Sequence, residues 1–191
     1  RPVPPLVAVR RALGAEVGAE AAARALQQAG YAAGDKLYDL LESHIVPTDG
    51  DASAERTVGD VGAATFWRRL SEMFATRGWG KLAHEEAHAG VGALESADWV
   101  EADPESGATR PSCFFSAGVL ANVLGRAAGG EVAVLEVECR SRGDLRCRFL
   151  FVGQDTLDSV YDAILTGQAA ASSVAPPPYA PPLPATDSGE P

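Results

Sequence analysis

The segment that most constrains the fold is residues 131–153, EVAVLEVECRSRGDLRCRFLFVG. Two runs rich in β-branched and aromatic residues flank SRGD, whose residues favour a reversal of the chain, so we predict an antiparallel hairpin. The second run places four apolar side chains on one face: Leu145, Cys147, Phe149 and Phe151. Arg146 and Arg148 share the other face, which predicts a sheet with one buried side.

Helical patterns precede this hairpin. Residues 113–128 have helix-forming content that ends at Gly129, and their small residues permit close packing. A second helix is predicted from about residue 64 to Arg77, and its apolar stripe consists of Phe66, Trp67, Leu70, Met73 and Phe74. We therefore predict an α/β fold of the α+β kind, with an antiparallel sheet packed against helices.

The remaining segments follow from breakers and periodicity. We predict three short helices in the Ala-rich first third, at 5–13, 15–29 and about 32–45, punctuated by Gly14, Gly30 and Gly34. We also predict a polar loop at 47–58, a strand in SADWVEAD (96–103) and a capped amphipathic helix at 155–166. The Pro-rich end predicts a disordered tail. The expected organisation is a helical segment at 1–58, a domain at 59–168 and the tail at 169–191.

Composition limits the classes of function. The formal net charge of -10 repels phosphate groups and argues against broad nucleic-acid binding. No apolar run approaches the ~20 residues of a membrane span, and the first residues lack a secretory signal, so we expect a cytoplasmic protein. Three cysteines in such a chain do not suggest paired disulfides. Metal ligation, a reactive thiol and simple burial all stay open.

The segment HEEAH contains His84, Glu85 and His88 at the H-E-x-x-H spacing of zinc metallopeptidases. That motif requires a helix and a third ligand, whereas glycines on both sides leave little room for a helix. Residues four apart share one face of a strand as well. We favour two histidines on an exposed or pocket-facing strand, and consider a metallopeptidase unlikely.

The segments SCFFSAG and LEVECRSRGDLRCRFLF resemble the 4-vinyl-reductase-type domain, also called the hydrocarbon-binding domain. It occurs in bacteriochlorophyll accessory proteins and in the sensor domains of phenol- and xylene-responsive activators. The resemblance implies a structural zinc held by Cys113, Glu136, Cys139 and Cys147. Glu136 and Cys139 would face opposite sides of a regular strand, so this ligand set requires a bulge near Glu138.

The resemblance also implies a ligand-binding fold related to nitric-oxide-sensing and Golgi-transport domains, usually as a homodimer. A cavity for a small hydrophobic ligand would lie between helices and sheet. The candidate lining residues are Phe66, Trp67, Leu70, Phe74, Trp79, Trp99, Phe114 and Tyr161.

Two hypotheses follow for the function. The first is a non-catalytic module that binds a small hydrophobic or aromatic molecule and signals through a partner protein. The second, suggested only by the family name, is an accessory protein in tetrapyrrole vinyl reduction, although no flavin, nicotinamide or iron-sulfur motif is visible. We favour the binding module.

Overall fold

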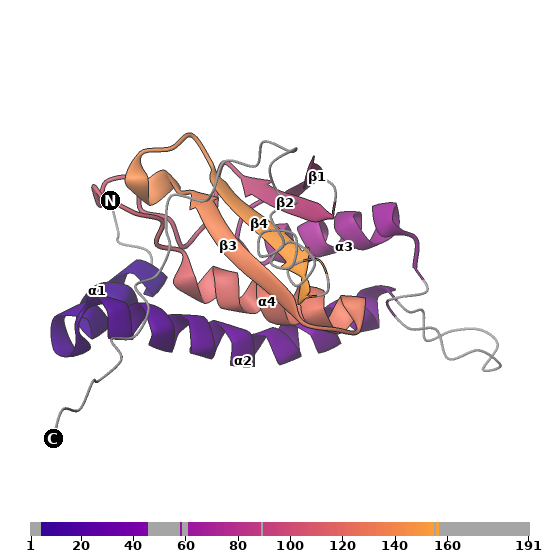
Figure 1. Ribbon diagram of the computed structural model, residues 1–191, viewed down its shortest axis with the longest axis horizontal. Coiled ribbons are helices and arrows are strands. Elements are labelled where there is room, and N and C mark those ends of the chain that lie inside the picture. Colours follow the sequence, from indigo (N-terminus) through magenta and orange to yellow (C-terminus); the bar gives the residue numbers. More distant parts are fainter. Residues whose placement is uncertain (1–4, 46–57, 59–60, 89, 155, 157–191) are drawn as a thin grey trace, which may run out of the picture. The chain divides into compact units, whose positions relative to one another are not determined.

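The computed structural model describes residues 5–45, 58, 61–88, 90–154 and 156, which all belong to the unit Arg1–Leu157. The helices and strands are α1 (Pro5–Val17), α2 (Ala19–Ile45), α3 (Ala63–Thr76), β1 (Ala83–His88), β2 (Val91–Ser96), α4 (Phe114–Ala128), β3 (Val132–Glu138) and β4 (Cys147–Gly153). Figure 1 shows α4 lying between the sheet and α2. The predicted α+β class is confirmed.

The strands form one antiparallel sheet in the order β1-β2-β4-β3. β3 and β4 are the arms of the predicted hairpin, which is confirmed, and a 3-10 turn at Arg140–Arg142 lies between them. Cys147 and Phe149 are on the buried face of β4, as the alternation indicates. Leu145 is 94% exposed because it precedes the first residue of the strand, so its predicted place on that face is wrong.

The helices α2 and α4 lie side by side in close contact. A Cβ built on Gly118 of α4 would lie 2.0 Å from the carbonyl oxygen of Gln27, and one on Gly30 of α2 would lie 2.0 Å from that of Phe115. Only glycine permits this approach at both positions. The small residues of α4 therefore serve helix packing, as predicted from the sequence.

The predicted breaks in the first third of the chain are wrong. Gly14 lies within α1, and Gly30 and Gly34 lie within α2, a single helix of 27 residues. The chain changes direction at Gly18, whose φ of 84° is in the left-handed region. Packing against α4 stabilises α2 across its glycines and outweighs their low helix propensity.

The helix α3 buries the predicted apolar stripe. Four of its residues are buried, namely Phe66, Leu70, Met73 and Phe74, while Trp67 is half-buried. Trp67 contacts Phe151 of β4, with ring centroids 5.5 Å apart. Because α3 packs near β1 and α4 packs on β3 and β4, the two helices cover one face of the sheet.

The strand predicted in SADWVEAD is wrong, because only Ser96 belongs to β2 and the following residues form turns. The Asp98 carboxylate accepts hydrogen bonds from the Lys81 N–H and the Ser96 hydroxyl, which turns the chain at the end of β2. Trp99 then enters the core. Its ring contacts those of Phe74, Trp79 and Phe149.

The sheet face opposite α4 carries a network of ion pairs. Arg146 contacts Glu95 at 2.8 Å and Glu138 at 3.0 Å, and Arg148 contacts Glu95 at 3.1 Å. The basic side chains of the hairpin are thus balanced by acidic neighbours, as expected from the acidic composition.

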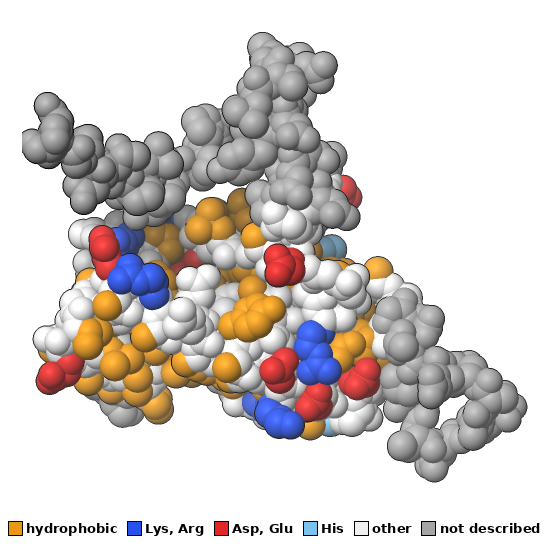
Figure 2. Space-filling view, turned by 60° about the horizontal axis from the view of Figure 1, so that its bottom comes forward, with side chains coloured by type: hydrophobic (Ala, Val, Ile, Leu, Met, Phe, Trp, Pro, Cys, Tyr) orange, Lys and Arg blue, Asp and Glu red, His pale blue; other side chains and the backbone are white. Residues whose placement is uncertain are grey.

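The helical face of the molecule is divided between apolar and charged side chains. Figure 2 shows hydrophobic side chains gathering toward the left, where α1 lies, and charged groups gathering to the right of centre. Val9, Val17 and Tyr31 are among the exposed apolar residues, and the Arg126–Asp39 ion pair joins α4 to α2 at 3.0 Å.

Several predicted segments fall outside the described residues. They are the loop at 47–58 except Val58, the helix at 155–166 except Thr156, and the tail at 169–191. Among the helices in the described part of the chain, none combines the length and apolarity that a bilayer crossing requires.

Candidate functional site

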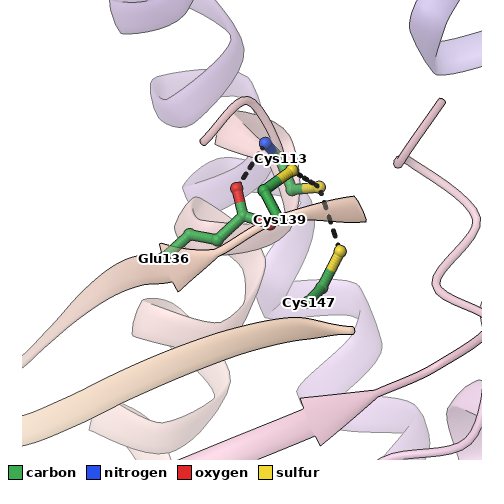
Figure 3. Close-up of side chains that lie close together, drawn as sticks. All are labelled: Cys113, Glu136, Cys139 and Cys147. Carbon is green, nitrogen blue, oxygen red and sulfur yellow. Dashed lines mark hydrogen bonds between the residues drawn. The ribbon is translucent and has the colours of Figure 1, made fainter. Parts of the chain in front are cut away.

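Cys113, Glu136, Cys139 and Cys147 come together in one buried cluster, shown in Figure 3. One ligand atom from each residue lies within 4.8 Å of the others, and all four residues are buried. Cys113 immediately precedes α4, Glu136 lies in β3, Cys139 directly follows β3, and Cys147 begins β4. The cluster therefore joins the start of the helix to both arms of the hairpin.

A bulge in β3 brings Glu136 and Cys139 to the same side. Glu136 pairs with Phe149 and Glu138 pairs with Arg148, so two steps along β3 match a single step along β4. The extra residue reverses the alternation of side chains from that point. The bulge that the ligand set requires near Glu138 is present.

The distances between sulfur atoms match those of a tetrahedral metal site. The Sγ of Cys113 lies 3.8 Å from that of Cys139 and 3.9 Å from that of Cys147. Thiolates at about 2.3 Å from zinc in tetrahedral geometry are separated by about 3.8 Å. A disulfide bond of about 2.05 Å is much shorter, and all three cysteines are free.

The carboxylate of Glu136 has one oxygen held by the backbone and one without a partner. Its Oε2 accepts hydrogen bonds from the N–H groups of Ser112 at 2.9 Å and Cys113 at 2.8 Å. Its Oε1 is buried and has no hydrogen-bond partner among the described residues. A buried acceptor without a donor is costly, and a cation would satisfy it. The four residues fit a divalent metal ion.

The electrostatics of the cluster agree with this fit. Burial raises the pKa of Glu136 to about 8, and the neighbouring Cys139 thiolate contributes to the shift. Hydrogen bonds from Cys113 and Cys147 to Cys139 lower the pKa of Cys139. Four acidic groups cannot all ionise in one buried space, whereas a bound cation stabilises thiolates and carboxylate together.

An apolar groove of about 350 Å³ lies between α3, the end of α4 and the hairpin. Its lining residues are Val58, Val61, Ala63, Phe66, Trp67, Gly90, Leu124, Ala127, Ala128, Val132, Phe151, Val152 and Gly153. None of them carries an ionisable side chain, so the groove suits an uncharged molecule.

The structure divides the predicted pocket residues into two groups. Phe66 and Trp67 line the groove. Four others belong to the core or pack against it, namely Leu70, Phe74, Trp79 and Trp99, while Phe114 is half-buried at the start of α4 and Tyr161 lies outside the described residues. The sequence analysis did not select Leu124 or Phe151, although the alternation of the hairpin had placed Phe151 on the inner face.

The HEEAH segment forms strand β1, as favoured from the sequence, and not the helix that a metallopeptidase motif requires. The His84 ring stacks on Trp67, with ring centroids 3.9 Å apart and an interplanar angle of 6°. Burial lowers the pKa of His84. His88 is exposed at the end of the strand. Neither histidine belongs to the cysteine cluster.

Comparison with known proteins supports the resemblance predicted from the cysteine-bearing segments. Residues 96–152 match the model of the 4-vinyl-reductase domain family, and this part of the chain is a 4-vinyl-reductase domain. The match begins at the end of β2 and includes all four residues of the cluster. No curated protein is similar enough in sequence to match.

Two solved structures are similar in fold. The phenol-responsive sensory domain of the transcription activator PoxR, solved with phenol, is 16% identical and has a TM-score of 0.59; the match covers 84% of this chain and 81% of that domain. A vinyl-4-reductase family protein from Methanocaldococcus jannaschii is 20% identical and has a TM-score of 0.47, with 67% of each chain covered.

Proposed function

We propose that this protein binds a small, uncharged hydrophobic or aromatic molecule in the groove, without catalysing its conversion, and that a structural zinc ion stabilises the 4-vinyl-reductase domain. The observation that carries the proposal is the uniformly apolar lining of a groove of about 350 Å³. This volume falls within the ~300–1,000 Å³ range of small-molecule sites.

The size and lining indicate the class of ligand. An apolar cavity of about 150 Å³ accommodates benzene, so this groove has room for a substituted ring or two fused rings. Trp67, Phe66 and Phe151 offer aromatic surfaces against which such a molecule would stack. The PoxR domain, whose fold is similar, was solved with phenol, and this supports a sensing role here.

The cluster supports the second part of the proposal. Cys113, Cys139 and Cys147 would supply thiolates and Glu136 the free Oε1, which together make four donors. Four protein ligands complete a tetrahedral zinc shell and leave no position for a reacting water. The zinc would therefore cross-link β3, β4 and the start of α4 and contribute to folding.

A fluorescence titration tests the ligand proposal. The uncharged probe N-phenyl-1-naphthylamine is expected to bind at one site per chain and to be displaced by phenols or naphthols. Ala127→Phe fills the groove and is expected to weaken binding at least about tenfold, the loss that corresponds to about 1.4 kcal/mol. Ala25→Phe, at an exposed position of α2, is the matched control.

Two results would contradict the proposal. Equal affinity of the probe for Ala127→Phe and Ala25→Phe would show that the groove is not the binding site. Selective displacement by chlorophyllide, with no response to phenols or naphthols, would favour the tetrapyrrole hypothesis.

A further inference from the structure

Two neighbouring arginines of α1 reach the segments that hold the cysteine cluster. Arg10 Nη1 donates hydrogen bonds to the carbonyl oxygen and to the hydroxyl oxygen of Ser112, both at 2.7 Å. Arg11 pairs with the Asp103 carboxylate at 2.7 Å. These contacts join residues about ninety to one hundred positions apart in the chain, as the separations of 102 and 92 show.

Ser112 lies against two members of the cluster. Its N–H donates to Glu136 Oε2 at 2.9 Å, and its hydroxyl lies 3.8 Å from the Sγ of Cys139. Ser112 is also the residue before Cys113. By fixing both oxygens of Ser112, Arg10 fixes the backbone that presents one thiol and orients the carboxylate.

Arg11 reaches the other side of the cluster through one intermediate. The Asp103 N–H donates to the hydroxyl of Ser141 at 2.8 Å, and Ser141 is fully buried in the turn that follows Cys139. Two side chains of α1 therefore connect to the segments that flank Cys113 and Cys139.

The charge of Arg10 also complements a loaded cluster. Three thiolates, one carboxylate and a divalent ion carry a net charge of roughly -2. A guanidinium held one residue away balances part of this charge in a buried setting, where ionic interactions are strong. Of the two arginines, Arg10 has the direct contact with the cluster's supporting residue.

We propose that Arg10 is a positioning residue of the metal centre, and that docking of α1 and occupancy of the cluster are thermodynamically coupled. The proposal rests on the metal site proposed above. If docked α1 favours the arrangement that binds zinc, then zinc must stabilise docked α1 to the same extent, because coupling between two binding events is reciprocal. α1 thus reports the state of the cluster to the surface of the molecule.

The first test measures zinc affinity by competition with a chromophoric chelator. Arg10→Ala is expected to weaken zinc binding about 10- to 100-fold at unchanged stoichiometry, the usual loss when a residue supporting a ligand is removed. Arg10→Lys keeps the charge but not the paired hydrogen bonds, and is expected to fall between Arg10→Ala and the wild type. Arg24→Ala, at an exposed arginine of α2, is the matched control and is expected to bind like the wild type.

The second test uses the wild type alone, so it does not depend on the folding of any variant. Hydrogen exchange of α1 amides is compared between zinc-loaded and zinc-stripped protein, with α3 as the internal reference. Loss of zinc is expected to accelerate exchange in α1 more than in α3.

The outcomes separate the two proposals. A wild type that binds no zinc overturns the metal site itself. One zinc per chain, with equal affinity in Arg10→Ala and Arg24→Ala, overturns the role of Arg10 alone. A uniform change of exchange in α1 and α3 overturns the coupling.

Discussion

Glu101 and Glu136 share the amino end of α4. Glu136 Oε2 accepts hydrogen bonds from the N–H groups of Ser112 and Cys113, and the Glu101 carboxylate accepts from those of Phe115 and Ser116, at 3.1 and 2.8 Å. The first N–H groups of a helix have no partner within it, and carboxylates also complement the positive end of its dipole. The same helix end is therefore stabilised by one carboxylate within the cluster and one outside it.

Replacing Glu101 separates capping from metal binding. Glu101→Gln keeps one acceptor but places an amide N–H against backbone donors, so we expect the free energy of unfolding to fall by about 2 kcal/mol. Urea denaturation measures this change, with Glu105→Gln, at an exposed position of the same loop, as the control. Equal stability of the two variants would contradict the capping role.

The pH dependence of this substitution has a defined sign. Burial raises the pKa of Glu101, so the folded protein holds its proton more tightly than the unfolded chain does. Its protonation therefore contributes stability that is fully present below the ordinary pKa near 4.5 and is lost as pH rises through the raised pKa. The stability of the wild type relative to Glu101→Gln should decline over that interval in urea titrations at successive pH values. An increase with pH would contradict the assignment.

The close approach of α2 and α4 predicts opposite effects for two Gly→Ala changes. Gly118→Ala places a methyl group 2.0 Å from the Gln27 carbonyl and is expected to destabilise the protein by about 3 kcal/mol. Gly14→Ala, in the interior of α1 with open space around it, is expected to stabilise by about 0.5 to 1 kcal/mol. Urea midpoints of both variants give the comparison. Similar values would show that the helices separate easily.

Gly92 controls the shape of the groove through Phe151. A Cβ at Gly92 would lie 2.1 Å from the end of the Phe151 ring, which would have to move. Because Phe151 lines the groove, we expect Gly92→Ala to change the affinity for N-phenyl-1-naphthylamine about fivefold or more, a difference of about 1 kcal/mol. Gly130→Ala, which meets nothing within 4 Å, is the control. An affinity equal to that control would place the probe elsewhere.

The parts of the fold that the sequence predicts well are those whose pattern and packing agree. The hairpin and α4 have clear periodicity and clear ends, and both were predicted correctly. The glycines of α2 misled the prediction because their purpose is contact with α4, which local propensity does not reveal. Trp99 misled it in the same way, since burial in the core does not require a strand.

The candidate site divides along similar lines. The cluster follows from motif spacing together with the bulge that its geometry demands. The groove depends on where the end of α4 meets the hairpin, so Leu124 and Ala127 could not be selected from residue type alone. The contact between Arg10 and Ser112 spans 102 positions and leaves no local pattern in the sequence.

The most direct test of the account is elemental analysis of the purified protein after dialysis against zinc, with Cys139→Ser and His88→Ala beside the wild type. We predict one zinc ion per chain in the wild type and in His88→Ala, and a large loss in Cys139→Ser, because Cys139 belongs to the buried cluster and His88 is exposed on β1. Zinc that persists in Cys139→Ser but disappears in His88→Ala would contradict the account.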